Sequence, residues 1–72
     1  MNIKINKNLR NLLEPELDIM KHVAQGKTNK QIAKEIYVSE HTVKAHIAKV
    51  LHVMNVKDRT EAVYKLAKFG LI

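Results

Sequence analysis

The chain has 72 residues, with no cysteine and only three aromatic residues, which excludes a disulfide scaffold, a thiolate metal site and a cysteine nucleophile. Thirteen basic residues against seven acidic ones give a formal net charge of +6, and so large a charge on a small domain favours nucleic acid as a partner, with an acidic membrane second. Hydrophobic residues make up 46% of the chain, too many for a disordered tail, while no apolar run approaches the roughly 20 residues of a membrane span.

The first predicted element is an amphipathic helix over residues 14–25. The residues before it, 1–11, are polar and basic, and we interpret them as a basic arm or the remnant of a linker. Pro15 stands where the first turn of a helix tolerates proline, and Gly26 supplies a C-terminal stop. Apolar residues recur at helical spacing at Leu13, Leu17, Ile19, Met20, Val23 and Ala24. The helix therefore presents one apolar face to a core.

A second helix is predicted over residues 29–36 and a third over residues 40–54. Thr28 and Gln31 have the spacing of a capping box, in which a threonine and a glutamine three residues later bond reciprocally to the backbone. Ser39 can cap the third helix after a short turn. A brief helix, a tight turn and a longer amphipathic helix are typical of a helix-turn-helix, whose second helix enters the major groove of DNA.

The outer face of the 40–54 helix is small and basic, whereas its inner face is apolar. Ala45 and Ala48 lie at the centre of the outer face. Small residues permit close approach to a surface, and basic neighbours supply hydrogen-bond donors, as insertion into the major groove requires. Taken alone, an ordinary exposed face with alanines chosen for helix propensity explains these positions equally well. The surrounding residues are His41, Thr42, Lys44, Lys49 and His52.

The last predicted helix spans residues 59–69 and follows a capping box formed by Asp58 and Glu61. This helix is apolar on two sides, which favours a second partner and hence a homodimer that places two recognition helices on an inverted repeat. The alternative is that Tyr64 only covers the edge of its own domain. Four helices joined by short turns predict an all-α fold, a compact four-helix bundle with a central helix-turn-helix.

Several blocks of the sequence resemble the LuxR/FixJ-type (GerE-like) DNA-binding domain of bacterial transcriptional regulators, a group that includes response regulators of two-component systems. The blocks are GKTNKQIA at 26–33, VSEHTVKAH at 38–46, DRTEAV at 58–63 and GLI at 70–72. The resemblance covers residues 12–72 and implies a domain that binds double-stranded DNA through its third helix. With no receiver site and no ligand pocket in the sequence, we expect either the output domain of a larger regulator or a stand-alone domain.

The resemblance also implies roles for individual residues. The base-facing residues that it implies are Lys44, Ala45 and Ala48, and we add His41 because it lies on the same outer face of the helix. The phosphate-contacting residues are Thr28, Asn29, Lys30, Thr42, His46 and Lys49. The contact of a homodimer through the last helix involves Thr60, Val63, Tyr64 and Ala67.

The sequence departs from the family pattern at three places. The usual threonine or serine cap of the first helix is Leu13, and the usual basic residue two positions later is Pro15, so we expect the start of that helix to be shifted or frayed. Val53 replaces a common lysine and removes one phosphate contact. Ala45 and Ala48 replace polar base readers, so Lys44, thymine methyl groups and DNA shape should carry more of the specificity.

Other functions fit the residues less well. His41, His46 and His52 lie five and six residues apart rather than the three or four that align ligands on a helix, so we predict no metal site and no cofactor. Glu16 and Asp18 point to different sides of a helix, so we predict no enzyme. The alternative function is a sigma-factor-like or protein-interaction module that docks on RNA polymerase or another acidic partner. We expect a soluble, cytoplasmic protein without a membrane partner.

Overall fold

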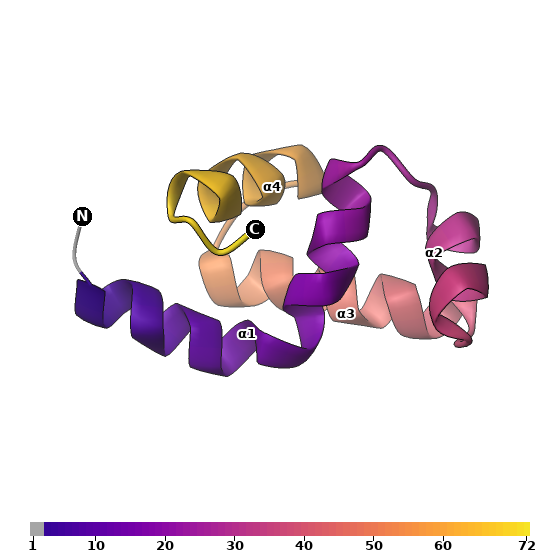
Figure 1. Cartoon of the computed structure of the whole chain (residues 1–72), viewed down its shortest axis with the longest axis horizontal. Coiled ribbons are helices and arrows are strands. Elements are labelled where there is room, and N and C mark those ends of the chain that lie inside the picture. The colour runs from indigo at the N-terminus through magenta and orange to yellow at the C-terminus, as the bar shows by residue number, and fades with distance from the viewer. Residues whose placement is uncertain (1–2) are drawn as a thin grey trace.

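The computed structural model describes the backbone of residues 3–72 and the side chains of residues 7–72. Its four helices are α1 (Ile3–Ala24), α2 (Asn29–Ile36), α3 (Glu40–Met54) and α4 (Arg59–Lys68). Figure 1 shows the second half of α1 crossing α3, with α2 near one end of α3 and α4 toward the other. No strand occurs in residues 3–72, and the predicted all-α bundle with a central helix-turn-helix is confirmed.

The first helix begins at Ile3, not near residue 14 as predicted. Residues 3–11 are therefore helical. That these residues serve as an arm or are the remnant of a linker concerns their role and stays a prediction. Residues 1–2 lie outside the described part of the chain. The physical reason lies at Leu13, which offers no side-chain oxygen to cap a helix at that position. Because residues 3–12 contain neither proline nor glycine, nothing in them ends the helix.

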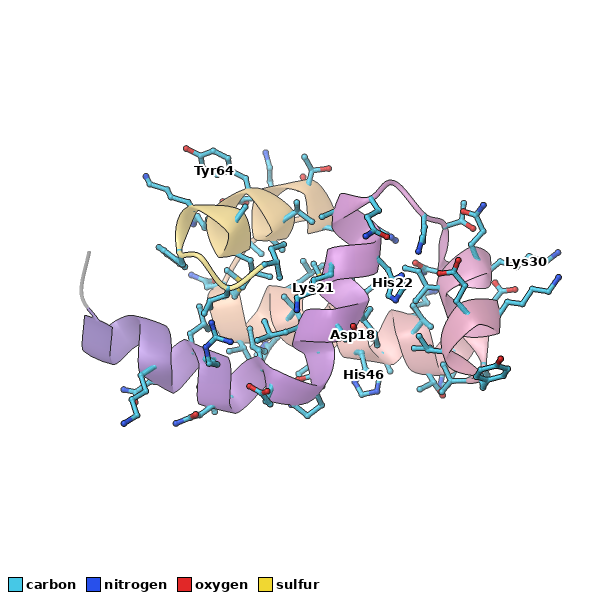
Figure 2. The ribbon with its side chains drawn as sticks, in the orientation of Figure 1. Asp18, Lys21, His22, Lys30, His46 and Tyr64 are labelled. Atoms are coloured by element: carbon cyan, nitrogen blue, oxygen red, sulfur yellow. The ribbon has the colours of Figure 1, made fainter. Side chains whose placement is uncertain are left out.

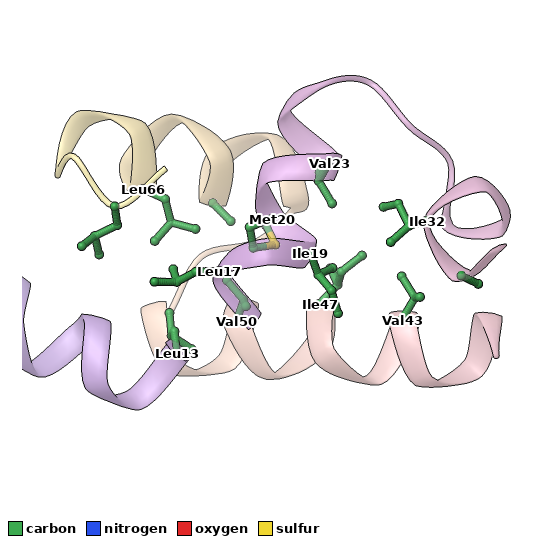
Figure 3. Close-up of a cluster of buried hydrophobic side chains, with 13 residues drawn as sticks. Leu13, Leu17, Ile19, Met20, Val23, Ile32, Val43, Ile47, Val50 and Leu66 are labelled. Atoms are coloured by element: carbon green, nitrogen blue, oxygen red, sulfur yellow. The ribbon is translucent and has the colours of Figure 1, made fainter. Parts of the chain in front are cut away.

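Pro15 lies inside α1, where it bends the helix instead of starting it. Proline lacks the backbone N–H of a helical residue, and its ring clashes with the carbonyl four residues earlier. The sharp bend of α1 is visible in Figure 1, and Figure 3 places Leu13 and Leu17 on its two sides. The predicted helix 14–25 thus corresponds to the segment after the bend, which ends at Ala24 before the left-handed Gly26 (φ 83°).

One hydrophobic core joins the four helices. Figure 3 shows residues of α1, among them Leu17 and Met20, facing Ile47 and Val50 of α3. The buried apolar side chains are Leu13, Leu17, Ile19, Met20, Val23, Ile32, Ala33, Val43, Ile47, Val50, Ala62, Leu66 and Leu71. Full burial of one such Leu, Ile, Val or Met stabilises a fold by about 1.5–3 kcal/mol, so this core holds α3 in place with one side turned outward.

Capping side chains set the starts of α2 and α3 as predicted. The hydroxyl of Thr28 accepts from the N–H of Gln31 at 3.1 Å, and the Gln31 side chain accepts from the N–H of Thr28 at 2.8 Å. Ser39 Oγ accepts from the N–H of Thr42 at 3.0 Å. Asn55 ends α3 in the left-handed conformation (φ 53°), which asparagine adopts more readily than most other residues.

Candidate nucleic-acid interface

The predicted base-facing residues share the outer side of α3. His41, Lys44, Ala45 and Ala48 are all exposed, whereas the apolar side of the same helix is buried in the core. The two alanines leave the helix backbone open to close approach, and Lys44 supplies a donor beside them. The outer side of α3 is therefore shaped and charged in the way that contact with base edges requires.

The first group of predicted phosphate-contacting residues lies at the N-terminus of α2. Lys30 is exposed and points to solvent from α2 in Figure 2. Thr28 is exposed, although its hydroxyl and its N–H are both engaged in the capping box, and Asn29 is half-buried. The first N–H groups of a helix have no partner within it and attract anions, so this end of α2 can receive a phosphate group.

Arg59, at the start of α4, joins this group although the sequence pattern gave it no role. Its Nη1 donates to Asn29 Oδ1 at 2.7 Å, and its Nη2 donates to the carbonyl of Lys27 at 3.4 Å. An open pocket of about 590 Å³ lies here, and the charged residues of its lining are Lys27, Lys30, Arg59 and Glu40. Because the Oδ1 atom of Asn29 is taken, its NH₂ group is the part left for a phosphate.

The second group of predicted phosphate-contacting residues lies on α3. Thr42 is half-buried, and its hydroxyl lies 3.0 Å from Ser39 Oγ, next to the cap of the helix. His46 and Lys49 keep 35% and 47% of their side chains exposed. These two residues lie along one edge of the alanine face and Lys44 lies along the other, so α3 presents basic side chains on both edges.

His46 and Lys49 also meet a buried carboxylate to which the sequence pattern assigned no role. Glu16 of α1 is 1% exposed. Its Oε2 lies 2.9 Å from Nδ1 of His46, and its Oε1 lies 2.8 Å from Nζ of Lys49. A buried charge is costly unless it is paired, and these two contacts supply the pairing. The structure thus brings one acid from α1 under the two predicted phosphate contacts.

The position of Glu16 within the apolar pattern is the signal that sequence reasoning missed. Leu13, Glu16, Leu17 and Met20 follow one another at intervals of three, one and three residues, so they share one face of a helix. That face packs on the core. A glutamate within it needs a cation from another element, but sequence alone does not say which one.

A further polar cluster connects α1, the loop after it and α2. Lys27 Nζ lies 2.9 Å from Nδ1 of His22 and donates to Glu35 Oε2 at 2.8 Å. His22 Nδ1 lies 3.3 Å from the same Glu35 oxygen, and Asp18 lies 3.8 Å from the other ring nitrogen. The hydrogen bond from Lys27 lowers the pKa of Glu35 below its ordinary value, and the charges of Lys27 and His22 act in the same direction. This cluster ties the last turn of α2, through Glu35, to Lys27 in the loop and to His22 of α1.

The predicted dimer-contact residues form an outer side of α4. Thr60, Tyr64 and Ala67 are exposed and Val63 is half-buried, with Tyr64 at 64% exposure. The ammonium of Lys68 lies 6.0 Å from the centre of the Tyr64 ring. Figure 2 shows Tyr64 and His46 on opposite sides of the molecule in that view, so the outer side of α4 faces away from the Glu16 contact.

Two features of the described residues bear on other functions. No helix there combines the length and the hydropathy that crossing a membrane requires. Within the same residues, no group of three or more histidines and acids is arranged to hold a metal ion. Two of the histidines, His22 of α1 and His46 of α3, lie close to carboxylates.

Comparison with known proteins adds an independent line of support. Residues 10–66 match the family described as bacterial regulatory proteins, luxR family. The chain is 36% identical over 70 residues to the transcriptional regulatory protein DegU of Brevibacillus brevis, which covers 97% of this chain and 30% of DegU. It is 49% identical over 51 residues to the nitrate/nitrite response regulator protein NarP of Escherichia coli, covering 71% of this chain and 24% of NarP.

A shorter relative matches along most of its own length. The chain is 37% identical over 59 residues to the spore germination protein GerE of Bacillus subtilis, which covers 82% of this chain and 80% of GerE. In contrast, the chain spans less than a third of the length of DegU and NarP. The shared part therefore corresponds to one domain of those two regulators.

Proposed function

The chain belongs to the luxR family of bacterial regulatory proteins, and on that premise we propose that it binds double-stranded DNA sequence-specifically, as a transcription regulator or its output domain. The family resemblance predicted from sequence is confirmed, and it supports a role in DNA-binding transcription regulation. The observation that carries the proposal of groove binding is the exposed outer side of α3, which Ala45 and Ala48 share with Lys44 and His41. In this proposal α3 enters the major groove. The protein would act in the cytoplasm, where the bacterial chromosome lies.

The proposed phosphate contacts come from the two helices of the helix-turn-helix. Free N–H groups at the start of α2, with Asn29 and Lys30, would bind one phosphate region. Thr42, His46 and Lys49 would bind another along α3. Support comes from the exposure of the two lysines and from the remaining donor of Asn29. Most of the affinity would then come from phosphates, and specificity from few base contacts.

A homodimer through α4 is the second part of the proposal. Thr60, Val63, Tyr64 and Ala67 would form a two-fold contact that places two copies of α3 on the half-sites of an inverted repeat. Support comes from the exposure of the Tyr64 ring on a side of α4 that the core does not cover.

A salt series with duplex DNA tests the proposed function directly. The logarithm of affinity should fall linearly with the logarithm of salt concentration, with a slope of about −0.9 for each phosphate contacted. Selection of bound sequences from a random duplex pool would give the site and its half-site spacing. Affinity that hardly changes with salt would contradict DNA binding and favour docking on a protein partner.

Lys44→Ala tests the groove assignment. We expect this change to lower affinity for the selected site by roughly 1–3 kcal/mol and to relax the choice at one base position, because the variant cannot donate to a base edge there. Lys30→Ala is the matched control, since removal of a phosphate-binding side chain should weaken all sequences nearly alike. Unchanged sequence preference in Lys44→Ala, measured by competition between duplexes, would place a different side of the domain in the groove.

A further inference from the structure

Glu16 is the one buried charged side chain among the described residues, and no step of the proposed DNA binding uses it. Its two carboxylate oxygens are divided between two side chains of α3: Oε2 lies 2.9 Å from Nδ1 of His46, and Oε1 lies 2.8 Å from Nζ of Lys49. We propose that Glu16 is a positioning residue for DNA binding: from α1 it holds the His46 imidazole and the Lys49 ammonium so that their outer donors face the DNA backbone. This inference rests on the proposed function.

The donors of Lys49 allow it to bind Glu16 and a phosphate at the same time. An ammonium group has three N–H donors, and Nζ of Lys49 meets Glu16 Oε1 as an ion pair at 2.8 Å without the geometry of a hydrogen bond. The side chain remains 47% exposed, so the other donors can meet a phosphate oxygen. A lysine already held by a buried partner also loses less freedom on binding than one that is free in solvent.

The imidazole of His46 can bridge in the same way, but only in one protonation state. An ionised carboxylate accepts hydrogen bonds and cannot donate them, so Nδ1 of His46 carries the proton in its contact with Glu16. The remaining nitrogen, Nε2, donates to phosphate only when it is protonated as well. Glu16 on α1 and Lys49 on α3 are the charged groups grouped with this ring. DNA binding through His46 therefore requires the imidazolium form.

The spacing of His46 and Lys49 lets them act on one stretch of the DNA backbone. His46 and Lys49 are three residues apart on α3, and residues at that spacing are neighbours on a helix surface. Both border Ala45 and Ala48 at the edge of the exposed side. The rival interpretation is that Glu16 competes with phosphate for the same cations, in which case its removal would strengthen DNA binding and not weaken it.

Salt dependence distinguishes positioning from competition. A labelled duplex of random sequence is a sufficient probe, because phosphate contacts do not depend on sequence. Glu16→Gln raises the net charge of the chain by one, yet we expect its salt slope to become shallower by about 0.9 for each phosphate that the variant no longer binds. Glu14→Gln is the matched control: it removes the same charge from an exposed position on the same helix, and its slope should not become shallower.

The salt slopes of the two variants test the role of Glu16, whereas binding by the unmodified chain tests the proposed function. A slope for Glu16→Gln equal to or steeper than that of Glu14→Gln would overturn the positioning role while DNA binding by the unmodified chain stands. Failure of the unmodified chain to bind the duplex even at low salt would overturn the proposed function and this inference together.

A measurement on the unmodified chain avoids dependence on the folding of a variant. Nitrogen-detected NMR of the histidine rings should show His46 protonated at Nδ1 in the free protein, and doubly protonated when the random duplex is bound. His46→Gln, which has no ring to protonate, should make the affinity for the duplex depend less on pH. A His46 ring that carries its proton on Nε2 alone, or that does not change on saturation with DNA, would overturn the proposal.

Discussion

At the residue scale, Tyr37 has the costliest conformation at the centre of the helix-turn-helix. It ends α2 with a left-handed backbone (φ 60°), and its N–H and that of Val38 bond to the carbonyl of Ala33. This conformation costs an L-residue about 1–2 kcal/mol. The tyrosine ring is 92% exposed and recovers little of that cost by packing. The tight turn between α2 and α3 is therefore held by hydrogen bonds against local strain.

Tyr37→Gly should raise the free energy of unfolding by about 0.5–1 kcal/mol, because relief of the left-handed strain exceeds the extra backbone freedom that glycine loses on folding. Urea unfolding followed by circular dichroism measures the change. Val38→Gly is the control at the next position, where φ is not positive, and it should lower stability. Equal destabilisation by both variants would mean that the phenol ring makes a stabilising contact.

At the element scale, polar contacts connect α2 to its neighbours in addition to the apolar core. Lys27 and Glu35 join the loop after α1 to α2, with His22 of α1 beside them. Arg59 joins α4 to the start of α2 through Asn29. Because α2 has only eight residues and short helices have little stability of their own, these contacts help to hold it in place: the Arg59 contact acts at its start, where the phosphate contact is proposed, and the Glu35 contact acts in its last turn.

The Glu35 contact predicts a pH-dependent contribution to stability. Its pKa is lowered in the folded chain, chiefly by the hydrogen bond from Lys27. The stabilisation is therefore present above the ordinary pKa of a glutamate, about 4.3, and is lost as the pH falls through the lowered pKa. Glu35→Gln should be less stable than the parent chain at neutral pH, and the difference should vanish in acid.

Urea unfolding of both proteins at a series of pH values checks this expectation. In a Lys27→Gln background the effect of Glu35→Gln should shrink at neutral pH, because the main partner is already absent. A difference between parent and Glu35→Gln that persists unchanged to low pH would show that the ionised carboxylate is not its source.

At the scale of the whole molecule, the packing of the helices leaves two separate surfaces exposed, one on α3 and one on α4. α1, α2 and α4 all contact α3, which leaves one outer side of α3 uncovered. Tyr64 on α4 and His46 on α3 point to opposite sides in Figure 2. A dimer through α4 would thus leave the proposed DNA-binding side accessible in both copies.

Tyr64→Glu should abolish cooperative binding to an inverted repeat while the domain still folds, since the ring is 64% exposed and a charge opposes an apolar contact. The ratio of full-site to half-site affinity, about 100-fold or more for linked sites, should fall toward independent binding. Tyr37→Glu is the matched control, the same change at an exposed tyrosine off α4, and it should preserve the ratio. An unchanged ratio in Tyr64→Glu would remove the proposed α4 dimer.

What the sequence determined by itself is local. The caps at Thr28 and Ser39, the left-handed end at Asn55 and the buried stripe of α3 all follow from residues within one or two turns of one another, and interactions at that range need no knowledge of the fold. The exposed side of α3 follows for the same reason, because it is the complement of the stripe. The predicted start of α1 was wrong, because a proline such as Pro15 can stand either in the first turn of a helix or at a bend within one. Only the packing of the helix on both sides of the bend distinguishes the two cases.

What only the tertiary structure decided is the set of contacts between distant segments. Glu16 meets His46 thirty residues along the chain, and Arg59 meets Asn29 at the same separation. Such pairs depend on how α1 and α4 cross the helix-turn-helix, and a carboxylate carries no sign of which cation it will face. The exposed cations of α3 could be read from the sequence. The buried acid that contacts His46 and Lys49 could not, because its partners are chosen by the packing of the helices.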